Sequence, residues 1–113
     1  MDIEKFSVKQ AESNYECIKG SFIEVDKESV TYQNKFEGSY IYILINSKQD
    51  VLYVGETGAS LYARIKGNGS GAHSQKEWFE EVQIIRYLNF PNNQYIRRKW
   101  ENEITIVLKP KYQ

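Results

Sequence analysis

Cysteine and histidine are almost missing from this chain of 113 residues, in which Cys17 and His73 are the only examples of either type. A lone cysteine excludes a disulfide bond within the chain and fits a reducing compartment. A structural zinc site needs about four such ligands, so one copy of the chain cannot build that site from cysteine and histidine. The candidate functional residues therefore belong to other residue types.

Long apolar runs are missing too. No stretch approaches the roughly 20 apolar residues that cross a bilayer, and residues 1–5 lack the basic start and apolar stretch of a secretory signal. We therefore expect a cytoplasmic protein with no membrane partner. The composition, 41% hydrophobic and 14% aromatic, is typical of a folded globule, and the length predicts one domain with a single core.

The chain has no excess of positive charge: 15 basic and 15 acidic residues give a net charge of zero, which by itself argues against a nucleic-acid partner. The distribution is less neutral. Residues 1–37 carry five lysines against eight acids, and residues 38–113 carry ten basic residues against seven acids. No acid occurs between Thr57 and Lys76. The basic residues in and beyond this acid-free stretch lie either on ordinary solvated helix faces or on a local face that binds phosphate.

Residues 1–37 are predicted to form an accessory element packed on the domain. Ser7 opens a capping-box spacing, apolar residues follow it at helical spacing, and Gly20 can end the helix. Two short alternating stretches, residues 22–25 and 30–32, flank a polar turn and predict a small hairpin.

The rest of the chain has clearer signals. The β-rich runs at residues 40–45 and 51–54 flank a polar turn and predict an antiparallel hairpin, and residues 82–88 are predicted to form a third strand. The expected fold is α+β, with a three-stranded antiparallel sheet flanked by helices. Start and stop signals predict three helices: one from Ser60 to Gly67, a short one opened by the Ser74 and Glu77 capping box, and a long one from Pro91 to Pro110.

The candidate chemistry lies in two aromatic triplets and two charged residues. The triplets are Tyr40-Ile41-Tyr42 and Tyr53-Val54-Gly55, and they lie on the strands of the predicted hairpin or directly after them. Arg64 follows on the first predicted helix after the hairpin. Glu101 lies nine residues before Pro110 on the last helix. Together they supply two phenols, a fixed cation and a single carboxylate, which suit a one-metal site that cuts a phosphodiester bond.

The order and spacing of the two triplets, Arg64 and Glu101 resemble the pattern of the GIY-YIG nuclease superfamily over residues 38–113. The resemblance implies a metal-dependent endonuclease, with DNA as the expected substrate. The chain departs from the family pattern at four places. Tyr40 replaces the first glycine, Glu56 puts an acid after the second triplet, the interval from Gly55 to Arg64 is one residue longer than usual, and His73 follows Arg64 by nine residues instead of about one helical turn.

The resemblance implies a role for each residue. The catalytic residues would be Tyr42, Tyr53, Arg64, His73 and Glu101, and Glu101 would hold a single Mg²⁺ or Mn²⁺ ion that keeps most of its waters. Arg64 would neutralise charge on the phosphate. Tyr42 is a poor base at its ordinary pKa near 10, and His73 is the alternative base. The distribution of basic residues, not the resemblance, predicts that nucleic acid contacts Lys66, Lys76 and Lys109, and Gly55 in the second triplet is expected to contact it too.

The sequence leaves two further alternatives open. Each residue also has an ordinary structural explanation; the tyrosines can be half-buried sheet residues, and Glu101 can pair with Arg97 or Arg98 one turn back. The chain would then be an inactive module of the same fold that binds nucleic acid or a protein partner. Residues 1–37 can also serve as a docking element for a partner protein or for a second copy of the chain.

Overall fold

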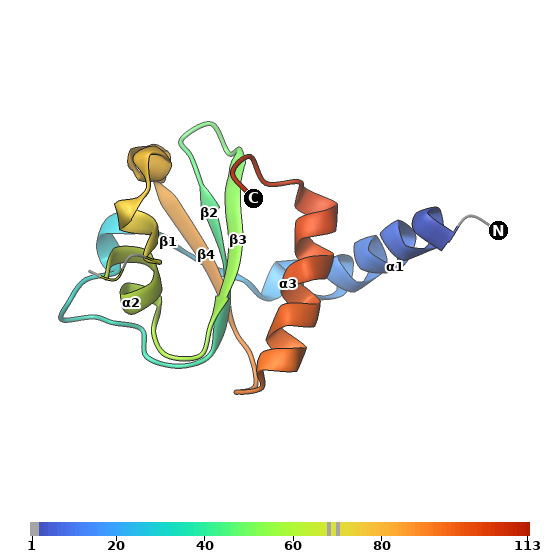
Figure 1. Cartoon of the computed structure of the whole chain (residues 1–113), viewed down its shortest axis with the longest axis horizontal. Helices are drawn as coiled ribbons and strands as arrows, with labels where there is room; N and C mark the ends of the chain where they lie inside the picture. Colours follow the sequence, from blue (N-terminus) through green and yellow to red (C-terminus); the bar gives the residue numbers. More distant parts are fainter. Residues whose placement is uncertain (1–2, 68, 70) are drawn as a thin grey trace.

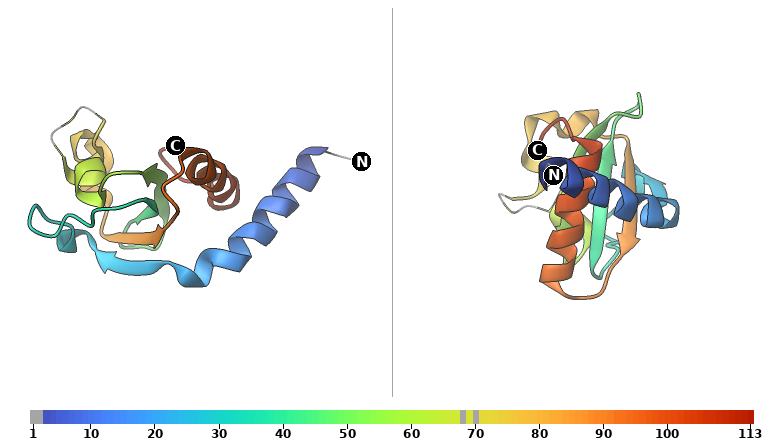
Figure 2. Two further views of the ribbon diagram at one scale, coloured as in Figure 1. Left: turned by 90° about the horizontal axis from the view of Figure 1, so that it is seen from below. Right: turned by 90° about the vertical axis from the view of Figure 1, so that its right-hand side faces the viewer.

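A computed structural model describes residues 3–67, 69 and 71–113, and it forms one sheet with helices on both faces (Figures 1 and 2). Short 3-10 turns, η1 to η4, join some of these elements. The strands are β1 (Ile23–Asp26), β2 (Tyr40–Ile45), β3 (Val51–Thr57) and β4 (Ile84–Asn89), and the helices are α1 (Ile3–Ile18), α2 (Leu61–Lys66) and α3 (Gln94–Leu108).

The sheet has four antiparallel strands in the order β1-β4-β2-β3, so the expected three strands were one too few. The hairpin predicted at residues 22–25 and 30–32 is wrong. Its first arm, β1, pairs instead with β4, with Ile23 opposite Tyr87. Lys27 begins a 3-10 turn, and the fully buried Val30 anchors the second arm to the core. The distant β4 supplies the hydrogen-bond partners that the local turn does not.

The β2 strand lies at the centre of the fold, with every residue buried. Its alternate side chains point to opposite faces of the sheet. Tyr42 and Leu44 pack with α2 residues on one face, whereas Ile41, Ile43 and Ile45 pack toward α1 and α3 on the other. The predicted β2–β3 hairpin and the later strand at β4 are confirmed.

The helix ends follow the sequence signals only in part. Ser60 caps α2 as expected, because its side-chain oxygen accepts a hydrogen bond from the amide of Ala63 at 2.9 Å. The N-cap of α3 is Asn93, two residues after the predicted start at Pro91. The capping box predicted at Ser74 is wrong, since Ser74 donates to the carbonyl of Gly67 and the residues after it form only 3-10 turns.

The first helix, α1, begins before its predicted cap at Ser7 and crosses the outer side of α3 (Figure 2). The side chain of Asn14 donates to the Glu103 carboxylate of α3 at 2.9 Å, and Ala11 is buried. The first turns of α1 extend beyond the sheet. None of the helices that the structure describes is long and apolar enough to span a bilayer.

Candidate active site

The centre of the site is a hydrogen bond between Tyr42 on β2 and His73 on the 3-10 turn η3 (His73–Gln75). The Tyr42 hydroxyl lies 2.6 Å from Nε2 of His73, and both side chains are almost completely buried. The long glycine-rich interval after α2 therefore does not carry the imidazole away from the sheet. Although His73 is nine residues beyond Arg64 in the sequence, η3 packs close to α2 and its imidazole reaches Tyr42.

Gly55 makes room for Tyr42. The two residues face each other across the β2–β3 pair. A side-chain carbon added at Gly55 would lie 2.9 Å from Cε2 of Tyr42 and still closer to its phenolic end. The second triplet therefore needs glycine at this position, because only a residue without a side chain lets the ring cross the neighbouring strand.

We expect Gly55→Ala to destabilise the fold by about 1–3 kcal/mol, because the buried Tyr42 ring has nowhere to move. Chemical denaturation measures this loss. Gly20→Ala is the matched control, since a side-chain carbon there meets no atom within 4 Å, and it should change stability by less than about 0.5 kcal/mol. An equally small effect at Gly55 would show that the ring is not packed as described.

Arg64 is the common electrostatic neighbour of the other predicted groups. It lies in the last turn of α2, and its charge acts on Tyr42, Tyr53, His73 and Glu101. Glu101 on α3 in turn acts on both phenols. The structure thus brings the five predicted catalytic side chains, from β2, β3, α2, η3 and α3, to one region beside the β2–β3 pair.

Burial sets the protonation states of this group. It raises the pKa of the Tyr42 phenol well above its usual value, although Arg64 acts in the opposite direction. Burial, together with Arg64 and Lys76, lowers the pKa of His73 to about 4. Burial and then the Glu56 carboxylate raise the pKa of Glu101, against Arg64 and Arg98. At neutral pH the free site therefore holds a neutral phenol beside a neutral imidazole.

The acid that follows the second triplet is paired. Glu56 accepts a hydrogen bond from Nε of Arg97 at 2.6 Å, and both side chains are largely buried. Arg97 also donates to Ser39 at 2.9 Å and to Asn92 at 3.2 Å. The sequence analysis missed this pair, although Arg97 precedes Glu101 by one helical turn and so shares its face of α3. The partner of Arg97 is Glu56, not Glu101.

An aromatic stack leads away from the site, and it was also missed. Tyr53 lies 4.4 Å from the ring centre of His73 and 5.9 Å from that of Trp78, which stacks on Tyr112 at 4.9 Å. Tyr112, which follows α3, therefore supports the position of the Tyr53 ring through Trp78. The side chain of Gln113 binds both the amide and the carbonyl of Val54 on β3.

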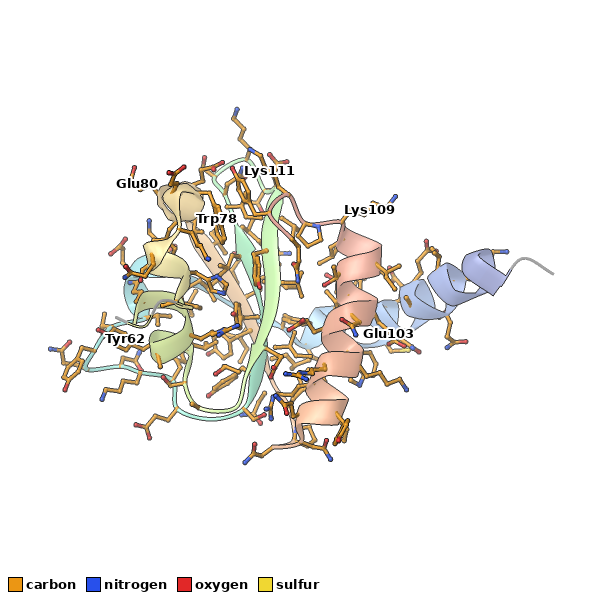
Figure 3. All side chains as sticks on the ribbon, viewed as in Figure 1. Tyr62, Trp78, Glu80, Glu103, Lys109 and Lys111 are labelled. Carbon is orange, nitrogen blue, oxygen red and sulfur yellow. The ribbon has the colours of Figure 1, made fainter. Side chains whose placement is uncertain are left out.

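The predicted nucleic-acid contacts are dispersed. Lys76 is near enough to act on His73. Lys66 lies near Glu28 and Lys27. Burial is the main cause that lowers the pKa of Lys66, and these two neighbouring charges act on it in opposite directions. Lys109 stands exposed at the far end of α3 (Figure 3). Gly55 is buried directly opposite Tyr42, and of the three lysines Lys76 is the one whose charge acts on His73.

The described residues contain no cluster of three or more His, Cys, Asp or Glu side chains that could hold a metal ion. Glu101 is the carboxylate that faces the phenols without a paired arginine. Burial and then Glu56 raise its pKa, and a cation there would stabilise the charged carboxylate. The donor set therefore fits a divalent ion that takes one protein ligand and completes its shell with water and substrate oxygens.

Acid should destabilise this protein through His73. Its pKa is lower in the fold, at about 4, than the ordinary 6.5, so the unfolded chain binds more protons between these values and stability falls as pH falls through that window. Relative to His73→Gln, the parent should lose up to about 3 kcal/mol from pH 6.5 to 4. Urea unfolding at several pH values measures the difference. A difference that stays constant with pH would show that His73 is not buried as a neutral ring.

The fold is a small α+β domain with a four-stranded antiparallel sheet between helices. Phenols, an imidazole, a guanidinium and a carboxylate lie together beside one strand pair. The family model described as the GIY-YIG catalytic domain matches residues 38–113, and the chain belongs to that family. Comparison of this chain with curated proteins and with solved structures found no significant match.

Proposed function

We propose that this protein is a metal-dependent endonuclease that hydrolyses phosphodiester bonds, with DNA as the expected substrate. The observation that carries the proposal is the 2.6 Å contact between Tyr42 and His73, with Arg64 and Glu101 close enough to act on the phenol. This arrangement joins a proton-transfer pair to a cation and a carboxylate, which are the groups that water attack on a phosphodiester needs.

In the proposed mechanism, Tyr42 receives a proton from the attacking water while its own phenolic proton passes to Nε2 of His73. A free phenolate is not required, which suits the raised pKa of Tyr42. The low pKa of His73 reflects burial and then the cations Arg64 and Lys76. A bound phosphate would offset those charges and make the imidazole a better proton acceptor.

Arg64 is proposed to contact the phosphate oxygens through its planar guanidinium, and Tyr53 to orient the water or the phosphate. Glu101 would hold a single Mg²⁺ or Mn²⁺ ion, which supplies Lewis-acid stabilisation of the leaving oxygen. Arg97 supports this role by holding Glu56 in an ion pair, which leaves Glu101 as the proposed metal ligand. Gly55, Lys66, Lys76 and Lys109 stay predicted contacts of the nucleic acid.

Plasmid nicking by the purified full chain tests the proposal. Supercoiled DNA should be converted to nicked and linear forms with Mg²⁺ or Mn²⁺ and should stay intact with EDTA. A labelled RNA of the same sequence, run in parallel, decides between the two nucleic acids. Absence of metal-dependent cleavage on both would overturn the nuclease proposal and favour the alternative, a binding module of the same fold.

We also propose that residues 38–113 form the catalytic unit and that residues 1–37 are an accessory element. The family match begins at residue 38, while α1 packs on α3 and β1 extends the edge of the sheet. A partner protein or a second copy of the chain would dock through this element. Light scattering of the full chain measures whether it forms a homodimer.

A further inference from the structure

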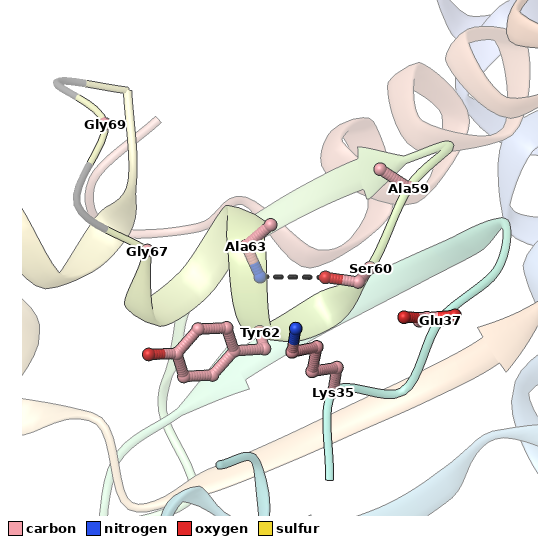
Figure 4. Close-up of a pocket in the computed structure, with 8 residues that line it drawn as sticks. All are labelled: Lys35, Glu37, Ala59, Ser60, Tyr62, Ala63, Gly67 and Gly69. Atoms are coloured by element: carbon pink, nitrogen blue, oxygen red, sulfur yellow. Dashed lines mark hydrogen bonds between the residues drawn. The ribbon is translucent and has the colours of Figure 1, made fainter. Parts of the chain in front are cut away.

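A shallow cavity of about 470 Å³, widely open to solvent, lies against the outer face of α2, and none of the five grouped side chains lines it (Figure 4). Its volume is within the range of about 300–1,000 Å³ typical of pockets for small organic groups. Small residues leave its floor open: Ala59, Ser60, Ala63 and Gly67.

Two side chains with specific chemistry complete the cavity. Tyr62 is half-buried against the core and packs edge-to-face with Tyr32 at a ring separation of 5.9 Å. Lys35 carries its amine 4.4 Å from the centre of the Tyr32 ring. Tyr32 thus contacts both the aromatic wall and the cation. These contacts with Tyr32 fix the positions of the Tyr62 ring and the Lys35 amine. An aromatic ring next to a cation suits the stacking of a nucleobase and the neutralisation of its phosphate.

The position of the cavity links it to the proposed cleavage site. Tyr62 and Arg64 are two residues apart on the same short helix, so they project from different faces of α2. Ala63 lies between them in sequence and lines the cavity. A strand that places one phosphate at Arg64 can therefore continue over the exposed face of α2 toward Tyr62.

The charges also limit how a nucleotide can lie. Glu37 shares the cavity with Lys35 (Figure 4). A phosphate must stay on the Lys35 side, because a carboxylate repels it. Glu37 can instead accept a hydrogen bond from the exocyclic amine of a base. A paired base has its ring faces covered by stacking and its amine engaged, so the occupant that fits is an unpaired nucleotide.

We propose that this cavity binds an unpaired nucleotide of the substrate strand next to the one that is cut, with the base on Tyr62 and the phosphate at Lys35. The inference rests on the proposed function for the identity of the ligand. It goes beyond that function because it assigns a second site, which would favour substrates with a single-stranded segment beside the cleaved bond.

Fluorescence anisotropy of the full chain in EDTA tests this site without cleavage. The probes are a short labelled single-stranded DNA and a blunt duplex of the same sequence. Tyr62→Leu keeps an apolar side chain against the core and should weaken single-strand binding about 5- to 100-fold, the value of one lost stack. Lys35→Gln should lower the salt slope for the single strand by about 0.7. Duplex binding should change little with Tyr62→Leu.

The matched controls are Tyr95→Leu and Lys48→Gln, which remove an exposed tyrosine and an exposed lysine outside the cavity. Equal losses in the controls, or equal losses for the duplex and the single strand, would overturn the proposed site. So would unchanged single-strand binding by a folded Tyr62→Leu. Single-strand binding that depends on Tyr62 in a protein that never cleaves would refute the nuclease proposal and keep the site.

Discussion

Replacing Glu101 by glutamine is expected to abolish metal-dependent cleavage while the protein stays folded. Glu101 is the carboxylate that faces both phenols, and the described residues offer no cluster of acids or histidines to replace it. Loss of a residue that merely orients a metal ligand typically costs about 10–100-fold. Loss of the one protein ligand should therefore lower kcat/KM by at least about 100-fold. Plasmid nicking at saturating Mg²⁺ or Mn²⁺ measures it.

Stability should move little or even rise in this variant, because the Glu101 carboxylate is partly buried and its pKa is raised. Glu103→Gln is the matched control. Glu103 lies on the same helix (Figure 3) but accepts a hydrogen bond from Asn14 of α1, so its loss removes one negative charge without touching the site. If both variants nick DNA as fast as the parent, Glu101 is only a surface acid and the one-metal proposal fails.

The second large effect is expected from Tyr42→Phe, which removes one oxygen atom from the centre of the site. The hydroxyl is the hydrogen-bond partner of His73, and the proposed mechanism moves two protons through it. General acid–base groups contribute about 10²–10⁴-fold, so kcat should fall by that factor with KM nearly unchanged. Steady-state cleavage of a labelled duplex gives both constants.

Tyr42→Phe should also leave Nε2 of the buried His73 without its partner, which costs about 1–3 kcal/mol in denaturation experiments. Tyr87→Phe is the control, because Tyr87 lies directly opposite Tyr42 on β4 and packs its ring edge-to-face against Phe36 and Tyr40. A variant at Tyr42 that is destabilised but fully active would assign the hydroxyl to packing and remove it from the mechanism.

Much of the sheet and of the long helix was predictable because its signals are local. The polar turn between β2 and β3 lies within a few residues of both strands, and the cap at Ser60 acts on the third residue after it. Local signals gave a wrong prediction where a distant strand supplied the hydrogen-bond partners. The alternation at residues 22–25 is the same for a hairpin arm and for an edge strand, and pairing with β4 decided between them.

Residue types and spacing by themselves determined the family and the set of candidate groups: the two triplets, an arginine and a glutamate at fixed intervals. The sequence could not show that Glu56 would be neutralised, because its partner Arg97 is 41 positions away.

The tertiary structure alone decided the environment of each group. A phenol and an imidazole 31 residues apart meet only when η3 packs beside the sheet. Burial then sets their pKa values in opposite directions, since removal from water disfavours the phenolate and the imidazolium alike. Spacing along a chain fixes which groups are available, whereas charge, burial and distance depend on contacts that form only in the packed fold.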